Sequence, residues 1–199
     1  MLTRKVVAED IPRLGSTLGL AFAEDPIVNW IFPGAETRRR ILPAFFSLQI
    51  RHLYLPYDEV YAIDSLAAAA LWLPPGQTAP GFASIMRLAI RLAPFLPRAG
   101  RAFPRIPRLL STLDANHPKA PHYYLAVLGT EPAEQGKGYG RALLEPLLER
   151  SDREAMPAYL ESSSPRNLSL YGRHGFNVIK ELKIGKTGPS MWLMWREPR

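Results

Sequence analysis

The feature that most limits the possible folds is a glycine-rich hexapeptide, QGKGYG at positions 135–140. It lies between an apolar run at 123–128 and an amphipathic run at 141–148. A strand, a glycine-rich turn and a helix start in this order can bind an anion. The backbone N–H groups of the turn and of the first helical turn can point at one phosphate, and the helix dipole adds partial positive charge. Glycine also lets a pyrophosphate approach the backbone without a Cβ in the way. The order therefore predicts a bound diphosphate.

The spacing of the glycines excludes two familiar phosphate loops. A Walker loop requires G-x-x-x-x-G-K-[ST], whereas here the interval from Gly129 to Gly136 is too long and Gly138 follows Lys137. A dinucleotide fingerprint requires G-x-G-x-x-G in an early strand–helix–strand unit, whereas these glycines run G-x-G-x-G late in the chain. The remaining pattern, Q-x-x-G-x-G, resembles the coenzyme A pyrophosphate loop of the GNAT N-acetyltransferase family. An ordinary tight turn between a strand and a helix is the alternative.

The sequence downstream of the loop continues the GNAT pattern. A strand at 158–161 is followed by a short helical segment that carries Asn167 and Tyr171, and then by Gly175-Phe176. The resemblance is densest from 123 to 195 and faint before about position 74. Within the family, the chain looks most like the puromycin N-acetyltransferase branch, through the run YLESSSPRN at 159–167 and the upstream QGKG.

The resemblance implies an α/β (α+β) fold of the GNAT type. Its central sheet is mixed but mostly antiparallel, has about six to seven strands splayed in the middle, and is flanked by helices. Hydrophobic patterning places strands at 2–8, 60–64, 67–73, 122–128, 157–161, 176–184 and 190–196, and helices at 9–23, 37–53 and 138–154. A helical insertion at about 76–118, with apolar-basic stretches at 81–96 and 98–113, separates the third strand from the fourth and would lie over the acceptor pocket. A chain of 199 residues, 47% hydrophobic, predicts one core and a single domain over 1–199.

The resemblance also implies acetyl-CoA as cosubstrate. The end of the fourth strand would bind the pantetheine arm and the acetyl oxygen through its backbone. The glycine loop would bind the pyrophosphate, Arg141 would add a donor, and Asn167 would contact the pantetheine. The predicted cofactor-binding residues are Leu128, Gly129, Thr130, Gln135, Gly136, Lys137, Gly138, Tyr139, Gly140, Arg141 and Asn167.

Two residues are predicted to carry the chemistry. Tyr171 lies four residues after Asn167, so both project from one face of a short helix. A phenol with a pKa near 10 can protonate a leaving thiolate, and the family places such a tyrosine near the coenzyme sulfur. For Tyr171, simple packing is the alternative.

The base is a separate question. Some GNAT enzymes keep a glutamate on the fourth strand, but the corresponding position here is Tyr124. Glu161, at the end of the fifth strand, is the best remaining carboxylate, and a solvated strand end is its alternative. Asp25 and Glu24, in the loop expected on the substrate side, are the other candidates for the base.

The acceptor is predicted to be a small-molecule amine. Asp25, Trp30 and Trp72 are the predicted substrate-binding residues, because the two indoles could wall an aromatic pocket. For each tryptophan, burial in the core is the alternative. Drug, polyamine, amino acid and protein N-terminus all stay open as acceptors, and the protein is expected to be a monomer or a homodimer.

Composition excludes several function classes. There is no cysteine, which removes disulfides, thiolate nucleophiles and a thioester-linked acetyl-enzyme, and the four histidines show no paired ligand spacing, so no metal is expected. No apolar run approaches the ~18–20 residues that span a membrane, and no signal-peptide core is apparent at the start, so we expect a cytoplasmic protein.

Two competing functions follow from the same features. A net charge of +7, with six arginines and no acid between Arg87 and Arg108, also suits nucleic acid, but four prolines interrupt that stretch and disfavour a regular recognition helix. We expect the stretch to be a solvated basic face, and a site for an anionic surface or an acidic partner is the alternative. A non-catalytic coenzyme A sensor on the same fold is the other alternative to the enzyme.

Overall fold

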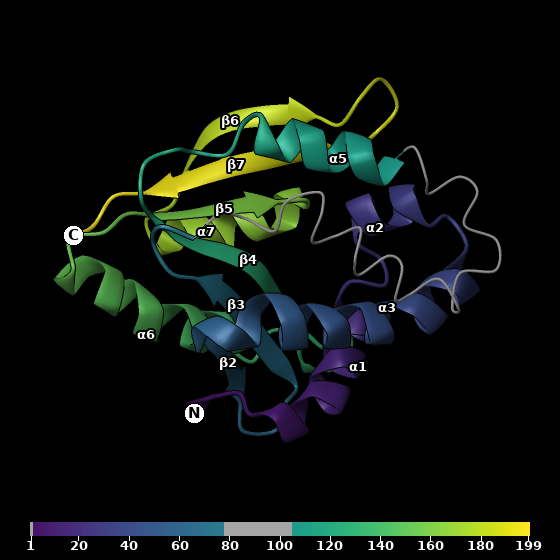
Figure 1. Cartoon of the computed structure of the whole chain (residues 1–199), viewed down its shortest axis with the longest axis horizontal. Coiled ribbons are helices and arrows are strands. Elements are labelled where there is room, and N and C mark those ends of the chain that lie inside the picture. Colours follow the sequence, from purple (N-terminus) through teal and green to yellow (C-terminus); the bar gives the residue numbers. More distant parts are fainter. Residues whose placement is uncertain (1, 78–104) are drawn as a thin grey trace.

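The computed structural model describes residues 2–77 and 105–199, and these build a seven-stranded sheet flanked by helices (Figure 1). The strands are β1 Thr3–Lys5, β2 Val60–Ile63, β3 Ala68–Leu73, β4 Tyr123–Thr130, β5 Ala158–Ser162, β6 Asn177–Lys183 and β7 Ser190–Arg196. The helices are α1 Ile11–Ala21, α2 Pro26–Ile31, α3 Ala35–Gln49, α5 Arg105–Asp114, α6 Tyr139–Arg153 and α7 Leu168–Arg173. Shorter helical turns are η1 Ala8–Asp10, η2 Ile50–Tyr54, η3 Leu55–Tyr57, η5 Pro132–Glu134 and η6 Pro165–Asn167.

The sheet opens at its centre. Its strand order is β1-β2-β3-β4-β5-β7-β6, and among the described strands every neighbouring pair is antiparallel except β4 and β5. The parallel pairing joins only Tyr123–Leu125 to Ala158–Leu160, although β4 continues to Thr130 and stays paired with β3. Beyond Leu125 the two central strands therefore diverge. The expected mixed, mostly antiparallel and splayed sheet is confirmed.

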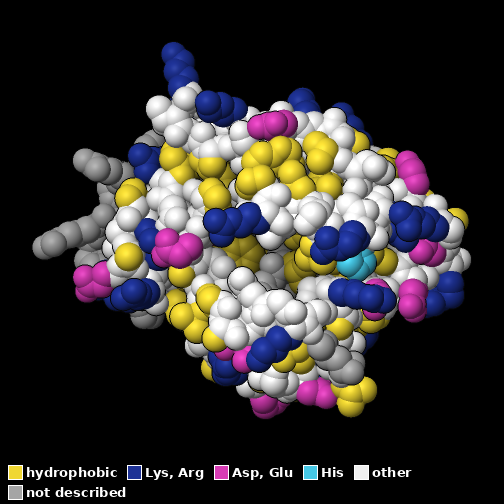
Figure 2. All heavy atoms as spheres, turned by 180° about the vertical axis from the view of Figure 1, so that it is seen from behind, with side chains coloured by type: hydrophobic (Ala, Val, Ile, Leu, Met, Phe, Trp, Pro, Cys, Tyr) yellow, Lys and Arg dark blue, Asp and Glu magenta, His cyan; other side chains and the backbone are white. Residues whose placement is uncertain are grey.

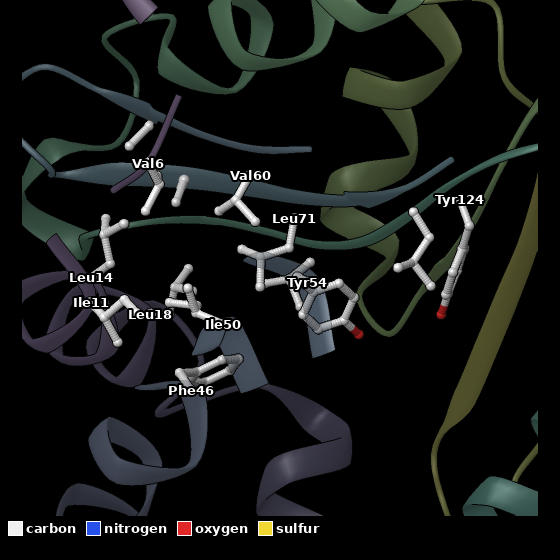
Figure 3. Packing of buried hydrophobic residues seen from close by; sticks show 14 of the residues in the cluster. Val6, Ile11, Leu14, Leu18, Phe46, Ile50, Tyr54, Val60, Leu71 and Tyr124 are labelled. Carbon is white, nitrogen blue, oxygen red and sulfur yellow. The ribbon is translucent and has the colours of Figure 1, made fainter. Parts of the chain in front are cut away.

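Alternation along the strands divides the core between the two faces of the sheet. Leu71 and Leu73 face α1 and α3, while Trp72 between them faces α6 on the other side. On the first face, Tyr54 and Tyr124 stand at one end of a cluster that includes Leu18 and Phe46 (Figure 3). This end of the cluster lies toward the opening between β4 and β5.

Helices α1 and α3 pack closely because α1 carries glycines at the contact. A Cβ on Gly19 would lie 3.1 Å from the Pro43 ring, and a Cβ on Gly15 would lie 2.6 Å from the Pro43 carbonyl oxygen. Pro43 lies inside α3, and the helix continues past it to Gln49 before a π-helical turn, Ile50–Tyr54. The segment predicted as a helix at 37–53 thus contains a proline and ends in a π-helical turn.

The described part of the insertion between β3 and β4 is α5. Together with α2 and the β6–β7 hairpin it encloses a small apolar cluster that contains Ile31, Ile184 and Met191. The predicted helical stretch at 81–96 and most of the arginine-rich stretch lie in 78–104, outside the described residues. Of the six arginines, Arg105 and Arg108 belong to α5.

Candidate active site

Two cavities meet where β4 and β5 diverge. One, of about 670 Å³, is lined by the ends of β4 and β5, the glycine loop, the start of α6 and α7, and is called here the loop cavity. The other, of about 700 Å³, is lined by α2, α3, α5 and the aromatic end of the core, and is called the aromatic cavity. Both are bordered by Phe22, Asp25, Ala126, Val127, Glu161 and Ser163. Seen from the back, the molecule is hollowed near its centre, with hydrophobic side chains at the bottom and basic side chains around it (Figure 2).

The glycine loop has the backbone geometry of an anion site. Gly136 and Gly138 have φ angles of 80° and 83°, the left-handed region that favours glycine, and a Cβ on either would meet no atom of the described residues within 4 Å. Gly138 is the N-cap of α6 and no side chain caps the helix there. The first N–H groups of a 15-residue helix are therefore directed at an open space.

The basic side chains of the loop are paired with acids. Lys137 Nζ donates to Glu134 Oε2 at 2.9 Å, and Arg141 Nε donates to Glu145 Oε1 at 2.6 Å. Gln135 Nε2 lies 3.4 Å from the Thr130 carbonyl oxygen, which ties the loop to the end of β4. Next to that end, a Cβ on Gly129 would lie 2.7 Å from Leu18, so β4 runs close against α1.

Tyr171 lies on α7 and lines the loop cavity with only 6% of its surface exposed. Burial, and then the nearby Asp25 carboxylate, raise the pKa of its hydroxyl, which keeps it protonated. Its ring meets Phe176 edge-on at 6.1 Å. Asn167 lies at the N-terminus of α7 and also borders the loop cavity, but it is exposed.

Asp25 is the N-cap of α2 and borders both cavities. Its Oδ1 accepts hydrogen bonds from the N–H groups of Ile27 (2.9 Å) and Val28 (3.1 Å), and its other oxygen accepts one from the Ser163 hydroxyl. Burial raises the pKa of this carboxyl, and the three hydrogen bonds oppose that shift in part. The loop that carries Asp25 is held by the buried Arg38, whose guanidinium donates to the carbonyl oxygens of Ala23, Phe32 and Pro33.

Glu161 lies at the splay, with its side chain only 5% exposed. Its Oε2 accepts a hydrogen bond from the Tyr124 hydroxyl at 2.5 Å, and its Oε1 accepts one from the Tyr159 hydroxyl at 3.0 Å. Tyr159 and Glu161 share a face of β5 because they are two residues apart. Tyr124, which the resemblance places at the position of the fourth-strand glutamate of some GNAT enzymes, thus bonds to the carboxylate of the neighbouring strand.

Histidine and tyrosine side chains complete the surroundings of Glu161. His117, in the segment after α5, has Nδ1 3.5 Å from Glu161 Oε1, and its Nε2 is buried without a partner among the described residues. Burial and the Glu161 charge raise the pKa values of Tyr54, Tyr124 and Tyr159, so these hydroxyls stay protonated. Sequence analysis missed His117 and Tyr54. The alternation on β5 could have indicated Tyr159 as a neighbour of Glu161.

Comparisons with known proteins agree with this architecture. A family model described as the acetyltransferase (GNAT) family matches residues 105–176, which include α5, β4, the glycine loop, α6, β5 and α7. An uncharacterized N-acetyltransferase of Schizosaccharomyces pombe is 29% identical over 208 residues, covering 100% of this chain and 84% of the relative.

Solved structures show the same fold. A Corynebacterium glutamicum structure, described as histone acetyltransferase HPA2 and related acetyltransferase, matches at a TM-score of 0.70 and 27% identity, over 99% of this chain and 96% of that one. Together these matches support an acetyltransferase with the GNAT fold. The polyamine N-acetyltransferase of Drosophila melanogaster matches at a TM-score of 0.62 and 16% identity, over 98% and 99% of the two chains, which shows the fold alone. The relatives support an enzyme that depends on an acyl-CoA.

The loop cavity of this GNAT fold fits an acyl-CoA. The two left-handed glycines leave open space in front of the backbone, and the uncapped start of α6 faces that space. Within residues 2–77 and 105–199, no group of three His, Cys, Asp or Glu side chains could hold a metal ion. No helix in those two ranges has both the length and the apolar character needed to cross a bilayer.

The two tryptophans predicted to bind substrate line neither cavity. Trp72 is fully buried, because strand alternation turns it toward α6 while the aromatic cavity opens on the opposite face. Trp30 packs in the apolar cluster under α5, with the Arg105 guanidinium 5.4 Å from its ring centroid and bonded to its carbonyl oxygen. The expectation of a pocket walled by these indoles is therefore corrected. The walls are phenylalanine and tyrosine rings instead.

Proposed function

We propose that the protein is an acetyl-CoA-dependent N-acetyltransferase that moves an acetyl group to a primary amine of a small molecule by direct attack in a ternary complex. One observation carries the proposal: two cavities of small-molecule size meet at two carboxylates beside the splay between β4 and β5. The loop cavity would hold the cosubstrate and the aromatic cavity the amine. The transfer forms a C–N bond and breaks the thioester C–S bond, with coenzyme A as the leaving group.

The residues at the junction would divide the chemistry between them. Glu161 would bind the ammonium or accept its proton, because it is a buried carboxylate that borders both cavities. The protonated Tyr171 hydroxyl would donate a proton to the leaving thiolate. The unpaired edge of β4 beyond Leu125 would orient the cosubstrate through its backbone, with Leu128, Gly129 and Thr130 as its contacts.

The remaining roles at the cosubstrate are also proposals. The loop from Gln135 to Gly140 would bind the pyrophosphate through its backbone, Arg141 would have to exchange its bond to Glu145 for one to a phosphate, and Asn167 would contact the pantetheine. Absence of cysteine leaves no thiol for an acetyl-enzyme, which favours direct attack. Likeness to the puromycin N-acetyltransferase branch remains a prediction, and so does a cytoplasmic location.

Purified protein tests the proposal in two steps. Calorimetry should show binding of acetyl-CoA, and a thiol-release assay against a diverse amine library should show release of coenzyme A that depends on an added amine. Binding without turnover of any amine would favour a coenzyme A sensor. Absence of acetyl-CoA binding in a folded protein would contradict both. A steep salt dependence of DNA or RNA binding, without acetyl-CoA binding, would favour the nucleic-acid alternative.

A further inference from the structure

The aromatic cavity has walls suited to an apolar ligand. Its rings come from Phe22 on the α1–α2 connection, from α3, from the turn that follows α3 and from β4, and aliphatic side chains of α2 and α5 close the other side. The aromatic lining residues are Phe22, Phe45, Phe46, Tyr54 and Tyr124. A volume of about 700 Å³ is that of a site for a small molecule. The walls are thus able to enclose a ring system, and they offer it edge and face contacts.

At the inner end of the cavity, no lysine or arginine of the described residues neutralises the charge of Asp25 and Glu161. Among the described residues, Asp25 accepts only from two backbone N–H groups and a serine, and Glu161 only from two tyrosines with His117 nearby. Elsewhere the molecule pairs its buried carboxylates with arginine, at 2.7 Å for Asp10–Arg4 and 2.5 Å for Glu59–Arg150. Burying carboxylates is costly unless a cation compensates them, so this end of the cavity suits a cationic group.

Charged groups are sparse in the rest of the cavity. Asp114 is exposed at the C-terminal end of α5, and the Arg108 side chain, also exposed, lies against Gly185, where a Cβ would be 3.2 Å from the Arg108 Nη1. A second ammonium on a polyamine would enter apolar surroundings before it could reach Asp114. A carboxylate on the carbon next to the amine, as in an amino acid, would lie beside two acids.

We infer that the acceptor is a monoamine with an apolar, aromatic body, whose ammonium lies between Asp25 and Glu161 and whose ring occupies the space between α3 and α5. This inference rests on the proposed acetyl transfer and names its acceptor class. The Drosophila polyamine N-acetyltransferase does not indicate a polyamine acceptor for this protein, because at 16% identity the likeness shows the fold alone.

A matched panel of amines tests the inference at saturating acetyl-CoA. It contains phenethylamine, phenylalanine, phenylalanine methyl ester and spermidine, and the measured quantity is kcat/KM. We expect kcat/KM for phenethylamine to exceed that for phenylalanine and that for spermidine by at least about tenfold. Phenylalanine and spermidine would each bury a second charge that the cavity does not compensate. The methyl ester, which keeps the ring and removes the carboxylate charge, should recover most of the difference from phenylalanine.

A wall variant tests the same inference by changing the charge of the cavity. Leu110 on α5 lines the cavity, and Leu110→Glu should raise the ratio of kcat/KM for spermidine over phenethylamine several-fold, because it gives the second ammonium a partner. Leu20→Glu adds the same charge at a side chain that is 52% exposed on α1 and lines neither cavity, and it should leave the ratio unchanged. Thermal unfolding of both variants controls for misfolding.

The outcomes separate the inference from the function on which it rests. If wild-type protein acetylates spermidine or phenylalanine better than phenethylamine, the acceptor class is wrong while acetyl transfer stands. If acetyl-CoA binds but no amine of the panel is acetylated, the inferred class is equally overturned. If acetyl-CoA itself does not bind to the folded protein, the proposed function fails before the acceptor is in question.

Discussion

At the scale of single residues, the role proposed for Tyr171, proton donor to the leaving thiolate, requires a hydroxyl that is protonated at the working pH. Its hydroxyl borders the loop cavity, and burial with the Asp25 charge raises its pKa above the ordinary value near 10. A raised pKa in a neutral acid means that the proton is retained, so the acid form should persist throughout pH 6 to 9. Tyr171 should therefore cause no loss of activity with rising pH in that range.

Replacing Tyr171 by phenylalanine removes the acid and keeps the ring packing against Phe176. We expect turnover to fall by an amount in the ~10²–10⁴ range usual for general acids, while acetyl-CoA affinity stays within a few-fold of wild type. Steady-state kinetics and calorimetry on the same preparation measure both. A Tyr171→Phe enzyme with wild-type turnover at every pH from 6 to 9 would remove this role from Tyr171.

Glu161 and Asp25, the two carboxylates where the cavities meet, can be distinguished by replacing each with its uncharged amide. Glu161→Gln should lower turnover, raise the KM for the acceptor, or both, with acetyl-CoA binding near wild type, since the carboxylate is bound by tyrosines on the acceptor side. Burial raises the pKa of Asp25, so that carboxylate loses its charge at a higher pH than an ordinary aspartate. The wild-type enzyme should therefore lose activity toward acid pH as Asp25 becomes protonated, and this loss should be absent from the pH–rate profile of Asp25→Asn.

Comparison of the two variants with one acceptor decides which carboxylate carries the base or anchor role. Impairment of Asp25→Asn alone would move that role to the loop before α2, and Glu161 would then serve only to order Tyr124 and Tyr159. Impairment of both, with different pH profiles, is the expected result, because each carboxylate borders both cavities.

At the scale of elements, the glycine loop is the part whose function depends on backbone conformation alone. Gly138→Val places a branched side chain at a φ of 83° and in the open space before α6. We expect acetyl-CoA affinity to fall by more than about tenfold, which calorimetry measures directly. Gly76→Val is the matched control, because Gly76 also has a positive φ (82°) and open space around it but lies in the turn after β3.

The control separates strain from lost binding. Both valine variants should lose stability through backbone strain, and only Gly138→Val should lose acetyl-CoA affinity. If the Gly138→Val protein is folded and binds acetyl-CoA as wild type does, the loop is an ordinary turn. If Gly76→Val lowers the affinity equally, the effect is general destabilisation and the loop assignment loses its support.

The elements differ in how well the sequence predicts them. The strand, glycine turn and helix at 123–153 are adjacent in the sequence, so local patterns predict them. The motif that continues to Phe176 indicates which elements follow, and the GNAT fold and its splayed sheet were therefore predictable. The face to which Trp72 points was not. Ala68–Leu73 is apolar at every position, and without polar alternation the phase of a strand cannot be read.

The aromatic cavity was even less accessible from the sequence. Its walls come from the turn before α2, from α3, from α5 and from β4, segments far apart in the chain that only the fold brings together. The sequence indicates ordinary core positions at Phe45, Phe46 and Tyr54. They have the same apolar helical spacing as residues that line no cavity. His117 follows α5 in a segment with no periodic signal at all.

At the scale of the whole molecule, the buried Arg196, outside the site, is held by a carboxylate. Arg196 at the end of β7 has a side chain that is 4% exposed and makes two 2.7 Å hydrogen bonds to Asp152, which joins β7, the last strand of the chain, to α6. The pKa of Asp152 is lowered, first by the hydrogen bond from Arg196. The pair is bidentate, with a buried guanidinium and a carboxylate that is 26% exposed, so loss of the carboxylate would leave the buried Arg196 charge without its partner.

The pair makes a prediction about stability and pH. A carboxyl whose folded pKa is lowered contributes stability that is present above its unfolded pKa of about 3.9 and is lost as pH falls through the folded value. Asp152→Asn should therefore destabilise the protein at pH 7, by at most about 3–5 kcal/mol, the cost of breaking a fully buried pair, and by less as the pH falls below about 3.9 toward pH 3. Urea unfolding of both proteins at the two pH values measures the gap.

Glu149→Gln on the same helix is the matched control, because Glu149 is exposed and its replacement removes the same charge. It should shift the unfolding free energy by less than about 0.5 kcal/mol at either pH. A gap between wild type and Asp152→Asn that stays constant from pH 7 to pH 3 would mean that Asp152 acts through packing or its bond to the Arg199 N–H, not through charge. A gap that closes toward pH 3 would mean that an ion pair between α6 and β7 holds the helix against the sheet whose opening forms the site.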